Sequence, residues 1–513
     1  MSGTAKTEAS PVEIRRQYDY IIVGGGTAGS VVAARLAENP AITVCLIEAG
    51  PTDAGRADVL SLKNWPHLLG TELDYDYRIE QQARGNSSIR HSRGRLLGGC
   101  SSHNSCIAFR APREDMDAWQ QLGCEGWGAQ ETKCYFDRVF ETVYIEKAPA
   151  INPVSQAFLV AAQQAGFDLV TFNTDDQLRA GAGVFQLNTR NGTRQSSSQA
   201  YLHPILVSAS NLTVLTDTVV NKIVLNEYNV AYAVETDNGI LAAHREIVLC
   251  CGTFNTPKLL LLSGIGPRQH LDEMGIPVKV ALAGVGEHLL DHPEGVIIWE
   301  TQRPVPDATT QYWEVGLFSR LFPASPLPDM MLHFGLIPFD WNTAPLGYPT
   351  AAHGFSMTPN VPRARSEGVV RLRSANPKDA PLIDFRYFTD QENYDETLLL
   401  AGMKLARKIA EQPALQRWVK RELAPGSHVQ DERELAEYAR RTSNTVYHPA
   451  GTCRMGARDH PMTVVDPQLR VKGVQHLRVA DASIFPTMIS VNPCITCMMI
   501  GEKCADLLHS AQE

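Results

Sequence analysis

The sequence predicts an α/β protein with two sheets, a mostly parallel sheet and an antiparallel sheet that is covered by helices in an inserted α+β domain. Three observations predict this class. An apolar run near the N-terminus, residues 18–26, ends in glycines and leads into a helical pattern. A run with the same plan follows at residues 245–267. Residues 296–445 instead mix aromatic segments, alternating strand-like runs and amphipathic helices.

The first element is a strand, YDYIIVGGG, because a short apolar run that ends in turn residues is typical of a buried parallel strand. We expect a helix from Thr27 to about Asn39, with small residues on its early turns, and a second strand in ITVCLIEAG. Strand, glycine turn, helix and strand in this order form a βαβ unit of the Rossmann type.

The turn of this unit carries the pattern GxGxxG at Gly24, Gly26 and Gly29. The first glycine allows a tight turn, the second leaves room for a pyrophosphate, and the third lets the helix pack closely on the strand. The helix N-terminus offers free N–H groups to the phosphates. Glu48 ends the second strand, where a carboxylate accepts hydrogen bonds from ribose hydroxyls. The pattern therefore predicts dinucleotide binding and leaves FAD and NAD open.

Later segments repeat this plan and suggest how the domains are arranged. REIVLCCGTFNTPKLLLLSGIGP reads as a buried strand, a tight turn and an apolar helix, and HLRVADASIFP reads as a short strand that runs into polar groups. Strands so far apart can join one sheet if another domain is inserted between them. We expect a discontinuous cofactor domain of residues 1–155, 195–300 and 446–513, and a substrate domain of residues 156–194 and 301–445.

Composition excludes several classes of function. The chain has 47 basic and 56 acidic residues and a formal net charge of -9, so we expect no nucleic-acid partner. It has no run of about 18 apolar residues, so we expect no membrane span. The polar N-terminus lacks the apolar core of a signal peptide. Eleven cysteines, several in apolar surroundings, indicate reduced thiols and a cytoplasmic protein.

Residues 94–104, GRLLGGCSSHN, crowd small and polar side chains into one segment. Glycine and serine let a backbone approach a ligand closely, and the hydroxyls, the amide of Asn104 and the ring of His103 can bond to it. The segment is therefore a second candidate ligand contact.

Six segments together carry a stronger signature. In chain order they are GGGTAGSVVAARL, GRLLGGCSSHN, GTFNTPKLLLLSGIGP, GVGEHLLDHP, NTVYHPAGTCRMG and LRVADASIFPTMISVNPCITCMMIGEKCADLL. With these motifs the chain resembles the glucose–methanol–choline (GMC) oxidoreductase family, flavoproteins that oxidise alcohols, from about Tyr18 to Leu508. Within the family, GGCSSHNSCIAFRAPRED, QYWEVG, MTPN and VNPCIT with YHPAGT most resemble the choline-oxidising members.

The resemblance implies FAD as the cofactor. It places GGCSSHN along the flavin ring and matches His103 to the histidine that is joined covalently to the flavin. The residues expected to bind FAD are Gly24, Gly26, Thr27, Ala28, Gly29, Glu48, Ala49, Gly98, Gly99, Ser101, His103, Asn104, Val220, Asp481, Ala482 and Pro493.

The resemblance also implies the catalytic groups. His448 in YHPAGT and Asn492 in VNP match the catalytic pair of the family: the histidine takes or shares the hydroxyl proton, and the asparagine orients the substrate oxygen. We expect His353 to bond the substrate oxygen and Ser105 to lie near the reacting edge of the flavin.

For the substrate, the resemblance implies choline, oxidised to betaine aldehyde and on to glycine betaine, with O2 reduced to hydrogen peroxide. A quaternary ammonium cannot donate a hydrogen bond, so a carboxylate and aromatic faces must hold it. We expect Glu314 beside Trp313 to supply the carboxylate, and Trp65 and Tyr447 to supply further aromatic faces. The family also favours a homodimer.

Three alternatives remain open. A related GMC enzyme could oxidise a neutral aryl, furan or aliphatic alcohol, but Glu314 would then have no partner. An inactive flavin-binding protein would not need His448 with Asn492, and an NAD-dependent dehydrogenase would lack GGCSSHN and VNP. The sequence does not separate an oxidase from a dehydrogenase. Cys494 and Cys497 form a single CxxC, which is poor evidence for zinc, so we expect packed thiols and no metal.

Overall fold

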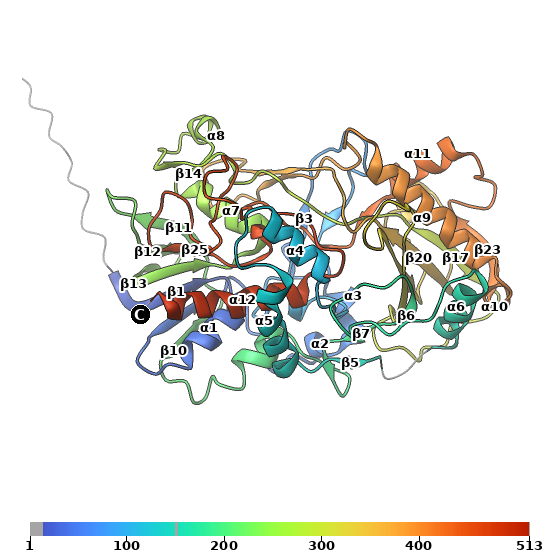
Figure 1. The fold of residues 1–513 in the computed structure, drawn as a ribbon, viewed down its shortest axis with the longest axis horizontal. Coiled ribbons are helices and arrows are strands. Elements are labelled where there is room, and N and C mark those ends of the chain that lie inside the picture. The colour runs from blue at the N-terminus through green and yellow to red at the C-terminus, as the bar shows by residue number, and fades with distance from the viewer. Residues whose placement is uncertain (1–13, 149–151, 512–513) are drawn as a thin grey trace, which may run out of the picture.

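Two sheets occupy the two ends of the molecule's long axis (Figure 1). The structure is a computed structural model and describes residues 14–148 and 152–511. The sheet that contains β1 lies in the left half of the view, and the sheet that contains β17 and β20 lies in the right half. The predicted fold class, a Rossmann-like α/β half joined to an antiparallel sheet covered by helices, is confirmed.

Within the described residues, the first sheet has the strand order β10–β2–β1–β13–β12–β11, with β25 also paired to β13. Strands β10, β2, β1, β13 and β25 run parallel, and β12 and β11 are antiparallel. Strand β13 is long enough to pair with β12 through its first residues and with β25 through its last three. The bounds are β1 (Ile14–Val23), β2 (Val44–Ile47), β10 (Leu212–Leu215), β11 (Val220–Leu225), β12 (Ala231–Thr236), β13 (Gly239–Leu249) and β25 (Leu477–Val479).

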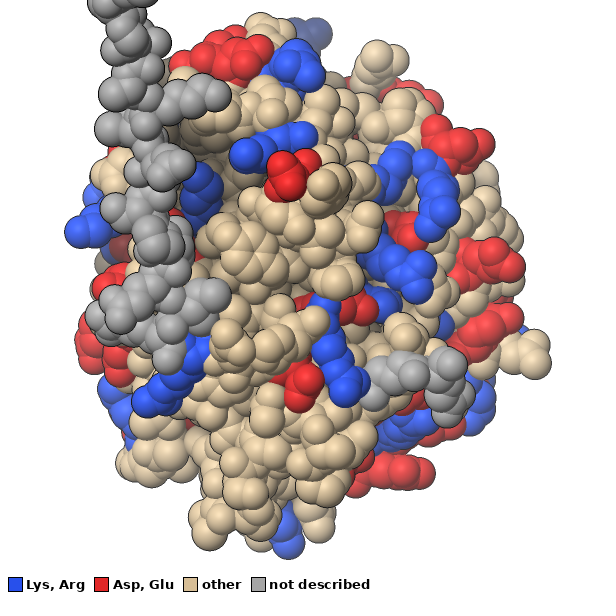
Figure 2. All heavy atoms as spheres, turned by 90° about the vertical axis from the view of Figure 1, so that its left-hand side faces the viewer, with Lys and Arg blue, Asp and Glu red and all other residues tan. Residues whose placement is uncertain are grey.

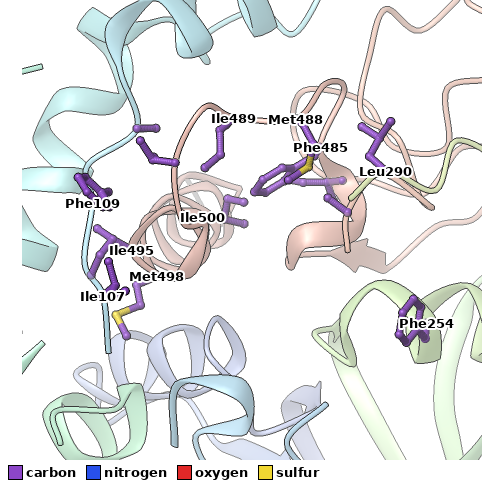
Figure 3. Packing of buried hydrophobic residues seen from close by; sticks show 14 of the residues in the cluster. Ile107, Phe109, Phe254, Leu290, Phe485, Met488, Ile489, Ile495, Met498 and Ile500 are labelled. Atoms are coloured by element: carbon purple, nitrogen blue, oxygen red, sulfur yellow. The ribbon is translucent and has the colours of Figure 1, made fainter. Parts of the chain in front are cut away.

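Four helices belong to this half: α1 (Gly29–Ala37), α5 (Ala129–Thr142), α7 (Gly252–Leu262) and α12 (Cys494–Ser510). Helix α12 packs against both α1 and α5, and most of its residues are buried. Its Ile495, Met498 and Ile500 belong to the same apolar cluster as Ile107 and Phe109 (Figure 3). A helix that is apolar on most sides is a core helix, so the segment just before α12 starts from a fixed support.

The second sheet is antiparallel, with the order β23–β17–β20–β19–β18–β6, and β16 links β20 to β24. Helix α9 packs against β17, β19 and β20, and α6 packs against β6 and β18. The bounds are β6 (Gly181–Val184), β16 (Pro293–Glu294), β17 (Ile297–Thr301), β18 (Val315–Ser319), β19 (Met330–Gly335), β20 (Gly354–Asn360), β23 (Val419–Ala424), β24 (Asn444–Thr445), α6 (Pro153–Gln164), α9 (Tyr394–Ala410), α10 (Pro413–Gln416) and α11 (Glu432–Thr442).

The remaining elements are short. They are α2 (Ala57–Leu60), α3 (Trp65–Leu68), α4 (Arg113–Gln121), α8 (Arg268–Glu273), β3 (Tyr77–Arg78), β4 (Arg90–His91), β5 (Glu146–Lys147), β7 (Gln186–Leu187), β8 (Thr189–Arg190), β9 (Thr193–Arg194), β14 (Ile265–Gly266), β15 (Val280–Ala281), β21 (Val369–Arg371) and β22 (Leu382–Asp384), together with the 3-10 turns Leu62–Asn64, Gly99–Ser102, Ala344–Leu346 and Ala482–Ile484 and the π-helical turn Ser198–Leu202.

Some predicted elements differ in detail from the structure. Helix α1 begins at Gly29 rather than Thr27, because the glycine turn extends to Ala28. GVVRLRS forms β21, which pairs only with β22 and packs against α7, outside the antiparallel sheet. Strands β16 and β17 belong to the antiparallel sheet although they begin before residue 301. The domain boundaries stay a prediction.

The surface shows no large field of one sign on the face seen in Figure 2, where Lys and Arg lie among Asp and Glu. In the part of the chain that the structure describes, no helix combines the length and the apolar character that crossing a bilayer requires.

Candidate active site

A cavity of about 690 Å³ is lined by residues of both sheets. At one end lie the glycine turn after β1 and the end of β2, which we call the glycine-turn end. At the other end lie His448, Asn492 and aromatic side chains, which we call the His448 end. The predicted residues that line it are Gly24, Gly26, Thr27, Ala28, Glu48, Ala49, Trp65, Gly99, His103, Asn104, Ser105, Val220, Trp313, Tyr447, His448, Asp481, Ala482, Asn492 and Pro493.

The glycine turn is shaped by close backbone contacts. Gly24 has a φ of +101°, and a Cβ there would lie 2.5 Å from the carbonyl oxygen of Cys250. A Cβ on Gly29 would lie 2.0 Å from the carbonyl oxygen of Gly24, so only glycine lets α1 approach this closely. A Cβ added to Gly26 would meet no protein atom closer than 3.8 Å, and Gly26 lines the cavity. Within the described residues no side chain caps the N-terminus of α1, and although the N–H of Ser30 donates to the carbonyl of Gly26 at 3.0 Å, this helix end is open to a phosphate.

Glu48 is fixed at the end of β2 by two backbone donors. Its Oε2 accepts from the N–H of Gly25 at 2.9 Å, and its Oε1 accepts from the N–H of Gly50 at 2.9 Å. Burial raises the pKa of Glu48 to about 7 despite these bonds. The carboxyl group therefore holds the glycine turn as well as facing the cavity.

The GGCSSHN segment forms a tight turn against this site. Gly98 and Gly99 both have positive φ, and a Cβ on Gly99 would lie 2.7 Å from the Cα of Gly26. Ser101 donates from its hydroxyl to the carbonyl of Gly98 at 2.6 Å and accepts from the N–H of Ser197 at 2.9 Å. Gly98 and Ser101, like Gly29, thus support the cavity wall from behind.

This turn places His103 in the cavity wall. The ring is buried, and its Nε2 has no hydrogen-bond partner among the described residues; the nearest carboxylate, Oδ2 of Asp74, lies 4.0 Å away. Burial lowers the pKa of His103 to about 4, so the ring is neutral at neutral pH. A neutral, unpartnered nitrogen in the cavity wall fits a bond to a ligand.

Asp481 organises the opposite wall. Its Oδ2 accepts from the N–H of Gly252 at 2.9 Å and from the hydroxyl of Thr256 at 2.6 Å, and its Oδ1 accepts from the N–H of Ser483 at 2.8 Å. These bonds tie the N-terminus of α7 to the turn after β25. The cradle of close glycines, free helix amides and buried carboxyls suits a dinucleotide such as FAD.

At the other end, His448 follows β24 and has three contacts. Its backbone N–H donates to Oδ1 of Asp291 at 3.1 Å, its Nδ1 lies 2.9 Å from Nδ1 of His292, and its Nε2 lies 3.4 Å from Nδ2 of Asn492. Burial lowers the pKa of His448 well below its ordinary value, and His292 lowers it further. The structure therefore brings together the predicted pair, His448 and Asn492, with a neutral imidazole.

Asp291 is a buried anion behind His448. Burial alone would raise its pKa, but contacts with His91, Thr445 and Tyr387 hold it below the ordinary value. Its Oδ2 accepts from the hydroxyls of Thr445 at 2.6 Å and Tyr387 at 2.5 Å. An ionised carboxylate here can stabilise positive charge that forms on the imidazole of His448.

Aromatic rings form the wall around this end. The rings of Trp65 and Trp313 meet edge to face with centroids 5.2 Å apart, and Phe339 meets Trp313 in the same way at 5.6 Å. Nε1 of Trp65 donates to the carbonyl of Gln311 at 3.0 Å, which fixes the indole. Trp65, Trp313, Phe339 and Tyr447 all line the cavity.

Two predicted residues lie elsewhere. His353 is exposed just before β20 and does not line the cavity, and within the described residues its backbone carbonyl accepts from the N–H of Thr301 at 3.2 Å, so the expectation that it bonds the substrate is wrong in this structure. Glu314 is buried outside the cavity: its Oε2 accepts from the N–H of Asn152 at 2.9 Å and the hydroxyl of Ser155 at 3.1 Å. Through these two donors it meets the N-terminus of α6. The expectation that Glu314 faces the substrate is also wrong in this structure.

The structure adds residues that sequence reasoning missed. His292 contacts His448, and Glu294 and His333 line the cavity. Nδ2 of Asn444 donates to Oε1 of Glu294 at 3.0 Å. The sequence signal for His292 and Glu294 is the run DHPE, two acids and a histidine around a proline, of which the family motif GVGEHLLDHP covers only the first three residues.

Cys494 and Cys497, the CxxC pair, also line the cavity. Burial raises the pKa of both thiols, so neither is a thiolate at neutral pH. They behave as packed, unreactive side chains.

Comparisons with known proteins agree with this picture. The family models described as GMC oxidoreductase match residues 18–294 and 364–501. The chain is 49% identical to choline oxidase from Arthrobacter globiformis, over 97% of this chain and 95% of that protein. It is 34% identical to the mitochondrial choline dehydrogenase of Homo sapiens, over 99% of this chain and 92% of that protein.

Solved structures share the fold. Pyridoxine 4-oxidase from Mesorbium loti superposes with a TM-score of 0.88 at 30% identity, covering 96% of this chain and 99% of that chain. A formate oxidase from Aspergillus oryzae reaches 0.88 at 24% identity, over 97% and 99% of the two chains, which shows the fold alone.

Proposed function

The chain belongs to the GMC oxidoreductase family, and from that premise we propose that it oxidises choline to betaine aldehyde and on to glycine betaine, with O2 reduced to hydrogen peroxide. The observation that carries the proposal is one cavity with a dinucleotide-binding turn at one end and the His448–Asn492 pair at the other. The likeness to the Arthrobacter choline oxidase over nearly the whole of both chains supports the substrate.

FAD is the proposed cofactor, held by the glycine turn, Glu48 and Asp481 at one end and by the GGCSSHN turn along its ring. When bound, FAD supplies the acceptor for the hydride of the substrate and passes the electrons to O2. The buried Nε2 of His103, which has no partner in the described chain, supports a covalent bond to the flavin at this atom.

The protein's own residues must lower the cost of removing the hydroxyl proton. An alcohol with a pKa near that of water, about 16, costs roughly 12 kcal/mol to ionise at neutral pH. We assign to the neutral imidazole of His448 the acceptance of this proton. The imidazolium so formed stays beside the buried Asp291 and stabilises the developing alkoxide, while Asn492 orients the substrate oxygen.

Glu294 is the carboxyl group that we assign to the ammonium of choline. It lines the cavity together with the aromatic wall of Trp65, Trp313, Phe339 and Tyr447. A quaternary cation binds to such faces and to a carboxylate. Burial raises the pKa of Glu294 to about 8, so binding of a cation should release its proton.

The decisive experiment compares choline with its neutral isostere, in which a quaternary carbon replaces the nitrogen. Purified enzyme is mixed with each alcohol without O2, and flavin reduction is followed by absorbance; hydrogen peroxide is measured separately in air. We expect choline to bind at least about tenfold more tightly, the low end for a desolvated charge pair. Equal use of both alcohols would contradict the proposal.

A neutral alcohol is the second candidate substrate. The specific observation in its favour is that Glu314, the carboxylate expected to hold an ammonium group, does not line the cavity. Equal use of the two isosteres would support this candidate and would point to an aryl or aliphatic alcohol.

We also propose a cytoplasmic homodimer. All eleven cysteines are free thiols, which suits a reducing compartment. Light scattering of the purified protein tests the dimer, since a monomer would scatter with half the mass.

A further inference from the structure

We propose that His292 is a positioning residue that fixes the tautomer of His448, so that Nε2 of His448 carries the lone pair that accepts the substrate proton. The inference rests on the proposed alcohol oxidation and deepens it. It follows from a chain of hydrogen bonds in which the donor or acceptor role of each nitrogen determines the role of the next.

The chain starts at a backbone carbonyl. Nε2 of His292 lies 2.9 Å from the carbonyl oxygen of Ile489. A carbonyl oxygen can only accept, so Nε2 of His292 must carry the hydrogen. In a neutral imidazole the other nitrogen is then an acceptor, so Nδ1 of His292 has a lone pair.

The next step is the contact between the two imidazoles. Nδ1 of His292 and Nδ1 of His448 lie 2.9 Å apart, with the ring planes nearly perpendicular. One nitrogen must donate, and the one in His292 cannot. Nδ1 of His448 therefore carries the hydrogen, and Nε2 of His448 is left as the free base that faces the cavity.

The same logic assigns the amide of Asn492. Nε2 of His448 lies 3.4 Å from Nδ2 of Asn492, and only an N–H group is compatible with a lone pair at this position. Oδ1 of Asn492 is then an acceptor, and it is buried with no partner within the described residues. The amide N–H of Asn492 reaches the single lone pair on Nε2 of His448 only over this long distance, so the substrate hydroxyl can replace it as the donor to Nε2.

Both imidazoles are neutral before the reaction, as the argument requires. Burial lowers the pKa of His292 to about 4 and lowers the pKa of His448 well below its ordinary value. Asp291 favours the charged form of His448, whereas His333 and Arg93 oppose it.

In the proton transfer, the O–H bond of the alcohol breaks, an N–H bond forms at Nε2 of His448, and the electron pair stays on the oxygen. The bond from Nδ1 of His448 to His292 is kept throughout. Loss of His292 would leave a buried N–H without an acceptor and would favour the tautomer in which Nε2 already holds the hydrogen.

The kinetic test uses three variants of the holoenzyme. His292→Leu removes the acceptor, and His292→Asn keeps an oxygen acceptor at the position of Nδ1. His270→Leu is the matched control, because Nε2 of this buried histidine on α8 accepts from the N–H of Leu372 at 3.0 Å, outside the cavity. Flavin reduction by choline is followed without O2.

We expect His292→Leu to reduce the flavin about 10- to 100-fold more slowly, with choline affinity nearly unchanged. His292→Asn should recover most of this loss, and His270→Leu should react at the wild-type rate. Equal rates in His292→Leu and the wild type, or equal losses in His292→Leu and His292→Asn, would overturn the proposal.

A second measurement tests the tautomer directly, even if the variants fold poorly. The ¹⁵N chemical shifts of histidine separate a nitrogen that carries hydrogen from one that does not, and His448→Gln identifies the signals. We expect the wild-type enzyme to show hydrogen on Nδ1 and none on Nε2 of His448. Hydrogen on Nε2 would overturn the proposal. If choline failed to reduce even the wild-type flavin, the proposed function would be wrong. The ¹⁵N spectrum would still decide separately whether His292 fixes the tautomer of His448.

Discussion

Glu294 and Glu314 are both buried glutamates of the antiparallel half, and their partners separate their roles. The carboxylate of Glu314 accepts from Asn152, Ser155 and the N–H of Thr310, so it is already satisfied by protein donors. Glu294 accepts from the amide of Asn444 and bonds with the side chain of Thr358, and it faces the cavity, where it can accept from a ligand. A carboxyl group that is only partly satisfied can accept a cation at lower cost.

The same substitution at the two positions tests this division. Glu294→Gln should weaken choline binding about 10- to 1000-fold, because it removes the charge that offsets a buried cation, and should leave binding of the neutral isostere nearly unchanged. Glu314→Gln should leave choline binding nearly unchanged and lower the free energy of unfolding by about 1–3 kcal/mol, because it places an amide N–H against donors. Binding is measured by flavin absorbance and stability by denaturant.

The pH dependence of choline binding adds a signature for Glu294. Its pKa of about 8 in the free protein means that the group is mostly protonated below that pH. Because a bound cation favours the carboxylate, choline affinity should rise with pH and level off above about 8. Glu294→Gln should lose this dependence. A flat profile in the wild type, or a selective loss of choline binding in Glu314→Gln, would reverse the assignment.

At this scale, the sequence predicted residues whose position is set by a local turn. His103 follows the glycine pair Gly98–Gly99, whereas His448 and Asn492 each directly precede a proline that restricts the backbone, and all three line the cavity. His353 and Glu314 lie next to strands β20 and β18, where the direction of a side chain depends on register and on where the strand begins. No local motif contains that information.

At the scale of elements, the turn between β1 and α1 combines two demands. Gly29 lets the helix approach the strand, since a Cβ there would lie 2.0 Å from the carbonyl oxygen of Gly24. A Cβ added to Gly26 would contact protein atoms only at ordinary distances, so the missing side chain leaves space in the cavity rather than in the packing. One motif thus carries a packing glycine and a ligand glycine.

Alanine at each position should separate these roles. Gly29→Ala should lower the free energy of unfolding by at least about 2 kcal/mol, because the added methyl group overpacks the contact between helix and strand. Gly26→Ala should be purified with much less flavin, because its Cβ fills the space for the pyrophosphate, and in the flavin-free His103→Ala background it should leave the free energy of unfolding unchanged. Denaturant unfolding and the ratio of flavin to protein absorbance measure the two effects. The reverse pattern would mean that the roles are exchanged.

At the scale of the whole molecule, the sequence predicted the class and the main pieces but not how they meet. The buried apolar runs of β1, β13 and β25 predicted strands. The change to aromatic segments, alternating runs and amphipathic helices predicted the inserted region. The pairing of β16 with both β20 and β24 was not predicted, because β16 and β24 have two residues each and carry no periodicity. Yet this pairing brings His292 and Glu294 beside His448.

Because the cavity is lined by both halves, bound FAD should stabilise the whole molecule rather than one sheet. The test needs a form that releases its flavin. Acid precipitation should leave the yellow colour with the wild-type protein, as expected for a covalent bond at His103, and should release it from His103→Ala. Colour that leaves the wild-type protein freely would mean that the flavin is not covalently attached.

His103→Ala, freed of flavin and titrated with FAD, should then gain about 2.7 kcal/mol of stability when free FAD reaches about 100 times its Kd. The two halves should respond as one unit. Tryptophan fluorescence reports on Trp119 and Trp127 beside the parallel sheet and on Trp299 in β17 of the antiparallel sheet, whereas far-UV circular dichroism reports on the backbone of both. Both transitions should move together to higher temperature as FAD is added. The contrary outcome is two separate unfolding transitions, of which FAD shifts only one. The two halves would then unfold independently, and the flavin would be held by the Rossmann-like half alone.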